Sequence, residues 1–260
     1  MGEKSDLTWR VLSDPPLPGH QNMARDQALA ELLLPLQGVL RLYRWDPPTV
    51  SFGRNEPSRG LYMQERAREE GVAFVRRPTG GRAVLHHREL TYCLVFPVGA
   101  FGGLKASYRR INEGLLAGIR ALGANAELAS SAGSSLPPDA GPCFRQPAEG
   151  EVTAVGRKLI GSAQVRIGGA ILQHGSIILD GDQSPLQRLR ADTEEVPAPA
   201  TLKALLGFVP DVEVLKDHLQ IGLSHVLGGV WSSGQLRDDE KGAAEELEDH
   251  YLDPEWTWRV

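Results

Sequence analysis

Alternation of apolar and polar residues, rich in β-branched and aromatic side chains, predicts strands in the first two thirds of the chain. Turn-forming residues such as the Pro47-Pro48 pair separate these runs. The expected strands are 7–12, 39–45, 49–53, 72–77, 83–86, 90–96, 151–155, 158–166 and 170–179. We expect 83–86 and 90–96 to form a hairpin, because only a short polar link separates them.

Helices are expected where apolar residues recur every three or four positions. The clearest case is 105–122, whose apolar residues share one face. A helix over 20–34 is expected to end before Pro35. Helical spacing also occurs at 58–70, 184–192, 200–206, 211–227 and 238–250.

The order of these elements predicts an α+β fold. The strands come in antiparallel clusters rather than in regular βαβ alternation, so we expect mixed, largely antiparallel sheets flanked by helices. The 260 residues suffice for one large domain or two small ones. We expect a single domain over 1–260, with its core at about 35–230 and a helical C-terminal segment over 200–260. The stretch 193–200 is expected to be a linker within that domain.

Composition narrows the class of protein. The net charge of −5 argues against a general nucleic-acid surface, which is usually basic. No apolar run approaches the roughly 18 residues that a membrane helix needs. The N-terminus, MGEKSDLTWR, has no apolar core like that of a signal peptide. We therefore expect a cytoplasmic protein with no nucleic-acid or membrane partner.

The chain has two cysteines in very different surroundings. Cys93 lies in the apolar run TYCLVF and is expected to be a small buried hydrophobe. Cys143 follows the long loop 129–142, and such loops are uncommon unless they are functional or disordered. Neither cysteine belongs to a CxxC or paired-histidine spacing, so we expect no metal site.

Cys143 is a candidate nucleophile. A free cysteine has a pKa of about 8.5 and is mostly thiol at neutral pH, but a nearby cation stabilises the thiolate. Lys158, on the next strand pair, could supply that cation and could also polarise a substrate carbonyl. The simpler alternative for Lys158 is a solvated lysine on a strand.

A glycine pair after the strand at 72–77 is a second candidate. Gly80 and Gly81 would let the backbone approach a ligand closely, and the flanking Arg77 and Arg82 would attract a carboxylate or phosphate. The segment matches neither the Walker A pattern nor GxGxxG. A plain hairpin turn with basic neighbours is the alternative.

Two histidines are candidates for proton transfer. His86 and His174 could each act as a base or a hydrogen-bond donor, or could be satisfied core residues. Gln164 and Arg166 flank an expected hairpin and could face the same pocket. His87 is expected to be exposed.

Taken together, the blocks RRPTGGRAVLH, GRKLIGSAQ and ILQHGSIILD resemble the lipoate/octanoate transferase and ligase superfamily. The resemblance extends over nearly the whole chain and implies the catalytic fold shared with biotin protein ligase. Within the superfamily the chain is most similar to the LipM octanoyltransferases. Arg82 replaces the third glycine usual in ATP-dependent ligases, and Pro142-Cys143-Phe144 matches the nucleophile segment. Because the sequence ends near residue 260, we expect no extra C-terminal domain of the kind that many lipoate ligases carry.

The resemblance implies a two-step acyl transfer. The Cys143 thiolate would take octanoyl from octanoyl-acyl carrier protein, and a lysine of a lipoyl domain, such as glycine-cleavage H protein, would then accept it as an amide. Lys158 would lower the pKa of Cys143, and no ATP, metal or other cofactor would be needed. The residues implied around the substrate are Arg77, Gly80, Gly81, Arg82, His86, Ala163, Gln164 and His174.

Two features of the site depart from the family's usual pattern. His87 stands where an aspartate is common, and 147–151 lacks a serine and two aromatics.

Acyl partners are usually acidic, so we expect a basic rim around an apolar tunnel that opens beside Cys143. The candidate rim residues are Arg44, Arg54, Arg76, Arg109 and Arg110.

Three other functions stay open from the sequence. One is an ATP-dependent lipoate–protein ligase, which would not need Cys143. Another is an amidotransferase that moves octanoyl from H protein to other lipoyl domains. The third is an acyl-protein-binding module with a decayed site.

Overall fold

The computed structural model describes residues 6–130, 149–192 and 198–260, so Cys143 lies outside the described residues. The strands are β1 (Thr8–Ser13), β2 (Gln37–Tyr43), β3 (Thr49–Phe52), β4 (Ala73–Arg76), β5 (Val84–His86), β6 (Glu89–Pro97), β7 (Glu127–Leu128), β8 (Val152–Ala154), β9 (Arg157–Lys158), β10 (Ile160–Ile167), β11 (Ala170–Ile178) and β12 (Val230–Ser233). The helices are α1 (Gly19–Glu31), α2 (Gln64–Glu69), α3 (Leu104–Ala121), α4 (Ser184–Leu189), α5 (Leu202–Leu206), α6 (Val212–Leu227), α7 (Asp238–Leu252) and α8 (Pro254–Thr257).

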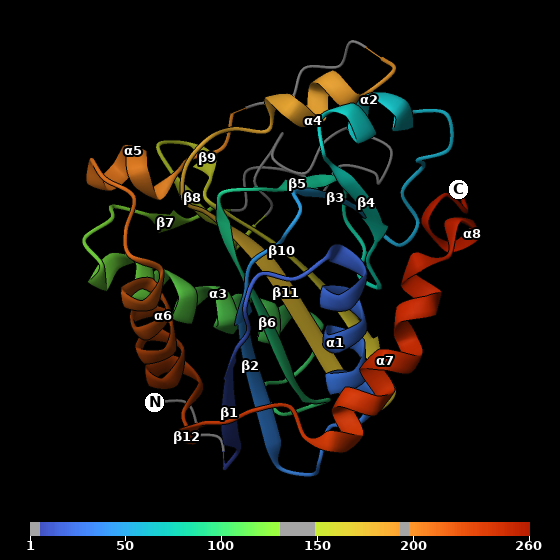
Figure 1. The fold of residues 1–260 in the computed structure, drawn as a ribbon. Coiled ribbons are helices and arrows are strands. Elements are labelled where there is room, and N and C mark those ends of the chain that lie inside the picture. Colours follow the sequence, from blue (N-terminus) through green and yellow to red (C-terminus); the bar gives the residue numbers. More distant parts are fainter. Residues whose placement is uncertain (1–5, 131–148, 193–197) are drawn as a thin grey trace.

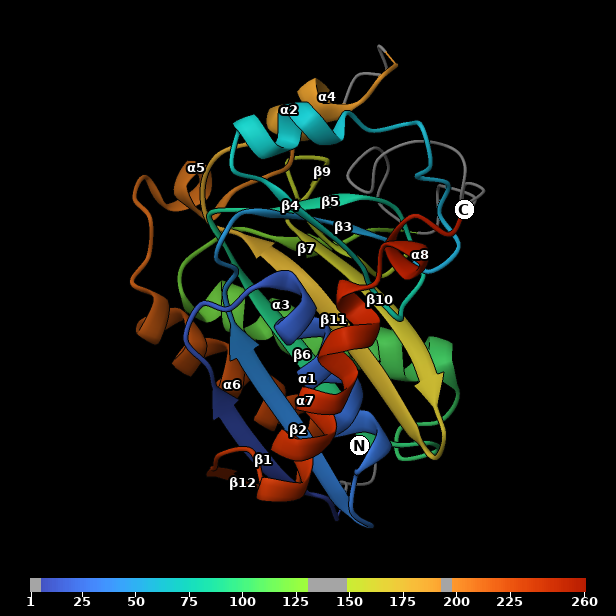
Figure 2. The same cartoon turned by 45° about the vertical axis from the view of Figure 1, so that its right-hand side comes forward.

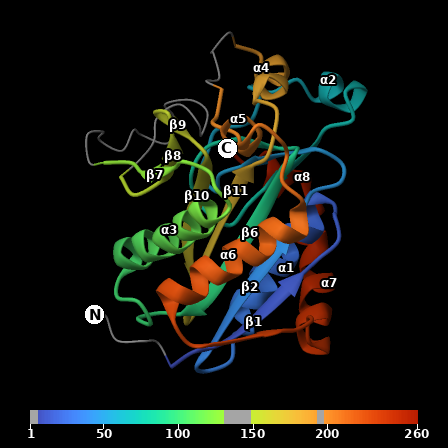
Figure 3. The same cartoon turned by 90° about the vertical axis from the view of Figure 1, so that its left-hand side faces the viewer.

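A six-stranded sheet in the order β10-β11-β6-β2-β1-β12 forms the centre of the molecule (Figure 1). The pairs β10–β11, β11–β6 and β6–β2 are antiparallel, whereas β1 is parallel to both β2 and β12. Helices α3 and α6 cover one face, and α1 and α7 cover the other (Figure 3). The expectation of mixed sheets flanked by helices is therefore confirmed.

Strand β6 shows why the sheet is covered on both faces. Successive side chains of a strand point to opposite faces. Leu94 and its even-numbered neighbours pack with α3 and α6, whereas Cys93 and Val95 pack in the cluster that includes Leu29 of α1. Cys93 is fully buried, as expected. Burial on both faces explains why this strand is apolar almost throughout.

Helices α3 and α6 approach closely through glycines. A Cβ atom on Gly118 would lie 2.5 Å from the carbonyl oxygen of His218, and one on Gly222 would lie 2.4 Å from that of Gly114. Side chains at these positions would force the helices apart. The amphipathic helix expected at 105–122 is confirmed, and its small residues set the distance to α6.

Two three-stranded sheets, β4-β3-β5 and β7-β8-β9, lie beyond one end of the central sheet (Figure 2). The C-terminal segment packs on the first of them. Arg76, at the end of β4, donates hydrogen bonds to the carbonyls of Trp256 and Thr257, and the carbonyl of Val260 accepts from the amides of Ser58 and Arg59. Residues distant in sequence thus meet beside the strand that leads to the glycine pair.

Several elements differ from expectation. The hairpin of 83–86 and 90–96 is wrong: β5 pairs with β3, whereas β6 enters the central sheet between β2 and β11. Because β6 is apolar on both faces, it is more stable at the centre of the large sheet than beside a three-residue edge strand. Of the helix expected at 58–70, only α2 (Gln64–Glu69) is helical. Strand β12 and helix α8 were not predicted. Strand β12 is mostly exposed, so its sequence shows no clear alternation.

Candidate functional site

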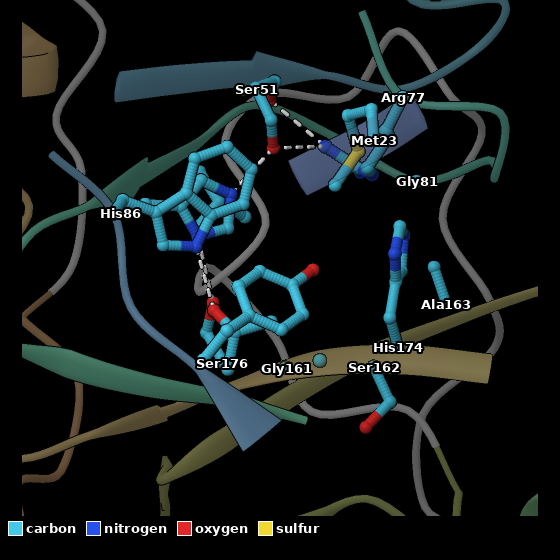
Figure 4. A pocket seen from close by; sticks show the side chains of 15 residues that line it. Met23, Ser51, Arg77, Gly81, His86, Gly161, Ser162, Ala163, His174 and Ser176 are labelled. Atoms are coloured by element: carbon cyan, nitrogen blue, oxygen red, sulfur yellow. Dashed lines mark hydrogen bonds between the residues drawn. The ribbon is translucent and has the colours of Figure 1, made fainter. Parts of the chain in front are cut away.

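A pocket opens where β10 and β11 of the central sheet meet β3, β5 and the glycine turn that follows β4 (Figure 4). It encloses about 420 Å³ of space, its open mouth included. Ala163 and His174 form one wall, and Ser51, His86 and Ser176 lie across from them. The lining residues are Met23, Tyr43, Trp45, Ser51, Arg77, Gly81, Val84, His86, Thr91, Gly161, Ser162, Ala163, His174, Gly175 and Ser176.

His86, the last residue of β5, is held between a hydroxyl and a carboxylate. Its Nε2 lies 2.7 Å from Ser51 Oγ, and its Nδ1 lies 2.9 Å from Glu89 Oε1. A carboxylate only accepts, so this geometry suits a proton on Nδ1 and a hydrogen bond donated by Ser51 to Nε2. Trp45 stacks on the imidazole with ring centroids 3.9 Å apart and donates to Thr91.

His174, in the middle of β11, has a matching environment on the other wall. Its Nδ1 lies 3.0 Å from Asp26 Oδ2, and its Nε2 lies 2.7 Å from Thr79 Oγ1. Burial lowers the pKa of His174 from its ordinary value, against the opposing effect of Asp26. Both histidines are therefore buried and satisfied within the protein, as in the core alternative.

Arg77 organises the glycine turn. Its guanidinium donates to the carbonyl and hydroxyl oxygens of Ser51 at 2.9 and 3.0 Å, to Gly80 O at 2.9 Å and to Arg82 O at 2.8 Å. The turn also needs a glycine at position 81, because Gly81 has a positive φ of 90°. Arg77 thus binds backbone on the chain's own turn, where the sequence suggested a ligand anion.

Lys158 is not a solvated lysine. Its Nζ lies 2.8 Å from Glu151 Oε2, and the two side chains are only 4% and 6% exposed. Tyr108 of α3 donates to the other Glu151 oxygen at 3.4 Å. A buried carboxylate beside the ammonium favours the charged lysine. The relation of Lys158 to Cys143 stays a prediction, because Cys143 lies outside the described residues.

The structure gathers only part of the expected substrate site. Arg77, Gly81, His86, Ala163 and His174 line the pocket, whereas Gly80, Arg82 and Gln164 do not. Alternation along β10 explains why Gln164 does not line the pocket: its side chain points to the opposite face of the sheet from Ala163. There it faces α3, and its amide lies 2.6 Å from that of Gln173 on the neighbouring strand β11.

Arg76 is not a rim residue, contrary to expectation. It is fully buried, and its guanidinium donates to the carbonyls of Gly53 and Glu56 as well as to the C-terminal segment. Arg44, Arg54 and Arg109 are exposed, and Arg110 is half-buried and bonded to the carbonyl of Val226. His87 is exposed, as expected.

The sequence did not indicate several polar residues of the site, namely Ser51, Thr79, Glu89 and Asp26. Asp26 had a usable signal. It lies three residues after buried Met23 on the core side of α1, where a charge is unusual. Its buried partner Arg41 lies at 2.7 Å. A charged residue on the apolar face of an expected helix therefore pointed to a buried network.

Neither a metal site nor a membrane helix is found in the described parts of the chain. In 6–130, 149–192 and 198–260, no group of three or more His, Cys, Asp or Glu side chains could hold a metal ion. Within the same ranges, no helix is long and apolar enough to cross a membrane.

Comparison with known proteins defines the class. Residues 18–223 match the lipoyl protein ligase A/B catalytic domain, and the chain belongs to this family. Solved structures of similar fold include lipoate-protein ligase A bound with ATP, with a TM-score of 0.81, 22% identity and coverage of 97% of this chain and 99% of that one. A bipartite lipoate protein ligase of Thermoplasma acidophilum has a TM-score of 0.76 and 22% identity, over 98% of this chain and 97% of that one.

Sequence relatives narrow the class further. Octanoyltransferase LipM of Kyrpidia tusciae is 39% identical, over 97% of this chain and 99% of the relative. The proteins of that name from Symbiobacterium thermophilum and Moorella thermoacetica are 38% and 36% identical, over 98% and 97% of this chain and 99% and 98% of the relatives.

Proposed function

We propose that this chain transfers an octanoyl group to lipoyl-domain proteins through a thioester on Cys143. The observation that carries the proposal is the pocket between the glycine turn and β10–β11. Its polar side chains, such as Ser51, His86 and His174, are bonded to other protein groups. The surface that remains for a ligand is therefore largely apolar, which suits a saturated acyl chain. The names of the full-length relatives support the same activity.

The proposed chemistry needs no external energy source. The Cys143 thiolate attacks the thioester carbonyl of the donor, a carbon–sulfur bond to Cys143 forms, and the donor thiolate leaves. The ε-amine of the acceptor lysine then attacks the octanoyl-Cys143 carbonyl, the amide forms, and the Cys143 thiolate leaves as the amine loses its proton. Lys158, held as an ammonium by Glu151, would stabilise the thiolate at the start and the end.

The donor and acceptor follow from this chemistry. A thioester-linked octanoyl group on acyl carrier protein is the proposed donor, and the lysine of a lipoyl domain such as glycine-cleavage H protein is the proposed acceptor. These partners would place the reaction in the cytoplasm. The exposed arginines Arg44, Arg54 and Arg109 are proposed to favour acidic carriers.

Intact-protein mass spectrometry tests the proposal. The protein is mixed with octanoyl-acyl carrier protein without ATP, beside a Cys143→Ala variant. We expect one octanoyl group on the protein, removable with hydroxylamine and missing from the variant. Transfer to H protein that requires ATP and free acid, and that survives Cys143→Ala, would instead identify a ligase. Acylation from octanoyl-H protein but not from the carrier would identify an amidotransferase.

A further inference from the structure

The glycine turn at residues 79–82 forms one edge of the pocket, and its position is fixed at several atoms. Gly81 O lies so close to Gly53 that a Cβ atom added there would be 1.8 Å away. Arg77 holds the carbonyls of Gly80 and Arg82. These contacts hold residues 80–82 in place. The remaining question is what holds Thr79, the first residue of the turn.

Thr79, the first residue of the turn, is anchored twice. Its carbonyl accepts from the amide of Arg54 at 2.8 Å, and its hydroxyl lies 2.7 Å from Nε2 of His174. Thr79 is fully buried and does not line the pocket. The hydroxyl bond therefore ties the turn to β11, which contributes His174 to the pocket wall.

For the Thr79 hydroxyl to donate a hydrogen bond to His174, Nε2 of the imidazole must be unprotonated. Asp26 ensures this, because its Oδ2 lies 3.0 Å from Nδ1 and requires the proton there. The Asp26 carboxylate is itself held by Tyr43 at 2.8 Å and by Arg41 at 2.7 Å. Both oxygens of Asp26 therefore have fixed donors, and the imidazole cannot easily turn over.

We propose that Asp26 and Thr79 are positioning residues that use the imidazole of His174 as a rigid link, holding the 79–82 turn at the edge of the acyl pocket. Neither residue lines the pocket, so both act through His174 and the turn. As an account of acyl-donor binding, the inference rests on the proposed octanoyl transfer. The link itself is a property of the folded chain.

The matched pair Thr79→Val and Thr79→Ser tests the link. Valine has nearly the shape of threonine but no hydroxyl, whereas serine keeps the hydroxyl. We expect Thr79→Val to raise KM for octanoyl-acyl carrier protein about tenfold, the equivalent of one lost buried hydrogen bond, with kcat little changed. Thr79→Ser should restore KM to near the original value. Equal KM values for the two variants would overturn the proposal.

A second readout needs no turnover. Nitrogen-15 NMR of the full-length protein labelled at histidine reports which ring nitrogen of His174 bears the proton. We expect a neutral ring protonated on Nδ1 at pH 7 in the unaltered protein and in Thr79→Val, and a mixture of tautomers in Asp26→Asn. A proton on Nε2, or a charged ring, in the unaltered protein would overturn the link. If octanoyl transfer fails but the Nδ1–H tautomer is found, only the proposed function falls.

Discussion

Lys158 and Glu151 form an ion pair of 2.8 Å that is almost completely removed from solvent. Glu151 directly precedes β8 and Lys158 is the last residue of β9, so the pair links two neighbouring strands of the small sheet β7-β8-β9. Desolvating two charges is costly, and the gain in stability from such a pair is small. A buried pair at this position therefore fits a functional requirement for a fixed ammonium.

Breaking the pair should be strongly destabilising. We expect Glu151→Gln to lower the free energy of unfolding by about 3 kcal/mol, because the Lys158 ammonium stays buried without its carboxylate. Urea unfolding followed by fluorescence measures the change. The double variant Glu151→Leu with Lys158→Met removes both charges and should recover most of the loss.

The same double variant separates stability from function. It should be folded and yet acylated by octanoyl-acyl carrier protein at least about a hundredfold more slowly, because no ammonium is left to stabilise a thiolate. Acylation rates from intact-mass time courses give the answer. A double variant as fast as the original protein would show that Lys158 has no part in the reaction.

Gly53 should tolerate no side chain. A methyl group there would lie 1.8 Å from Gly81 O, so Gly53→Ala must push the turn away from β3. We expect a loss of more than about 2 kcal/mol in stability, together with weaker binding of the acyl donor. Gly242→Ala is the matched control: it lies in α7 with nothing within 4 Å of the added Cβ, and should be neutral or slightly stabilising.

Acyl length should depend on Ala163. This side chain lies on the pocket wall, about 4.0 Å from the place of a Cβ on Gly81. Ala163→Leu would fill part of the cavity, so we expect a large loss of octanoyl transfer and a smaller loss with butanoyl donors. Competition between acyl carriers of different chain length, read by mass spectrometry, measures the ratio. An unchanged ratio would place the acyl chain outside this pocket.

Stability should fall as the pH drops below about 6.5, in part through His174. Burial lowers its pKa, so the unfolded chain binds this proton before the folded chain does, and protonation draws the equilibrium toward unfolding. The charged and titratable groups around the ring are Asp26 of α1, which opposes the shift, and Arg77 and His86, which add to it. Urea unfolding at pH 7 and pH 5.5 should show a smaller difference for His174→Gln than for the original protein.

The sequence predicted most elements correctly, because the spacing of apolar residues in strands such as β6 and helices such as α3 follows which side chains are buried. The hairpin failed because spacing shows that two strands are neighbours in sequence but not which sheet each joins. At the site, the glycine pair and His174 were evident as motifs. Thr79 and Glu89 were not, since a hydroxyl or carboxylate becomes significant only when the fold brings an imidazole to it.

The hydrogen bonds between Arg76 and the C-terminal segment have a practical consequence for anyone who modifies this protein. Val260 O is occupied by two amides of the 58–59 segment, so the last residues act as a strap across the sheet that leads to the glycine turn. An affinity tag or fluorescent fusion placed after Val260 would pull on that strap.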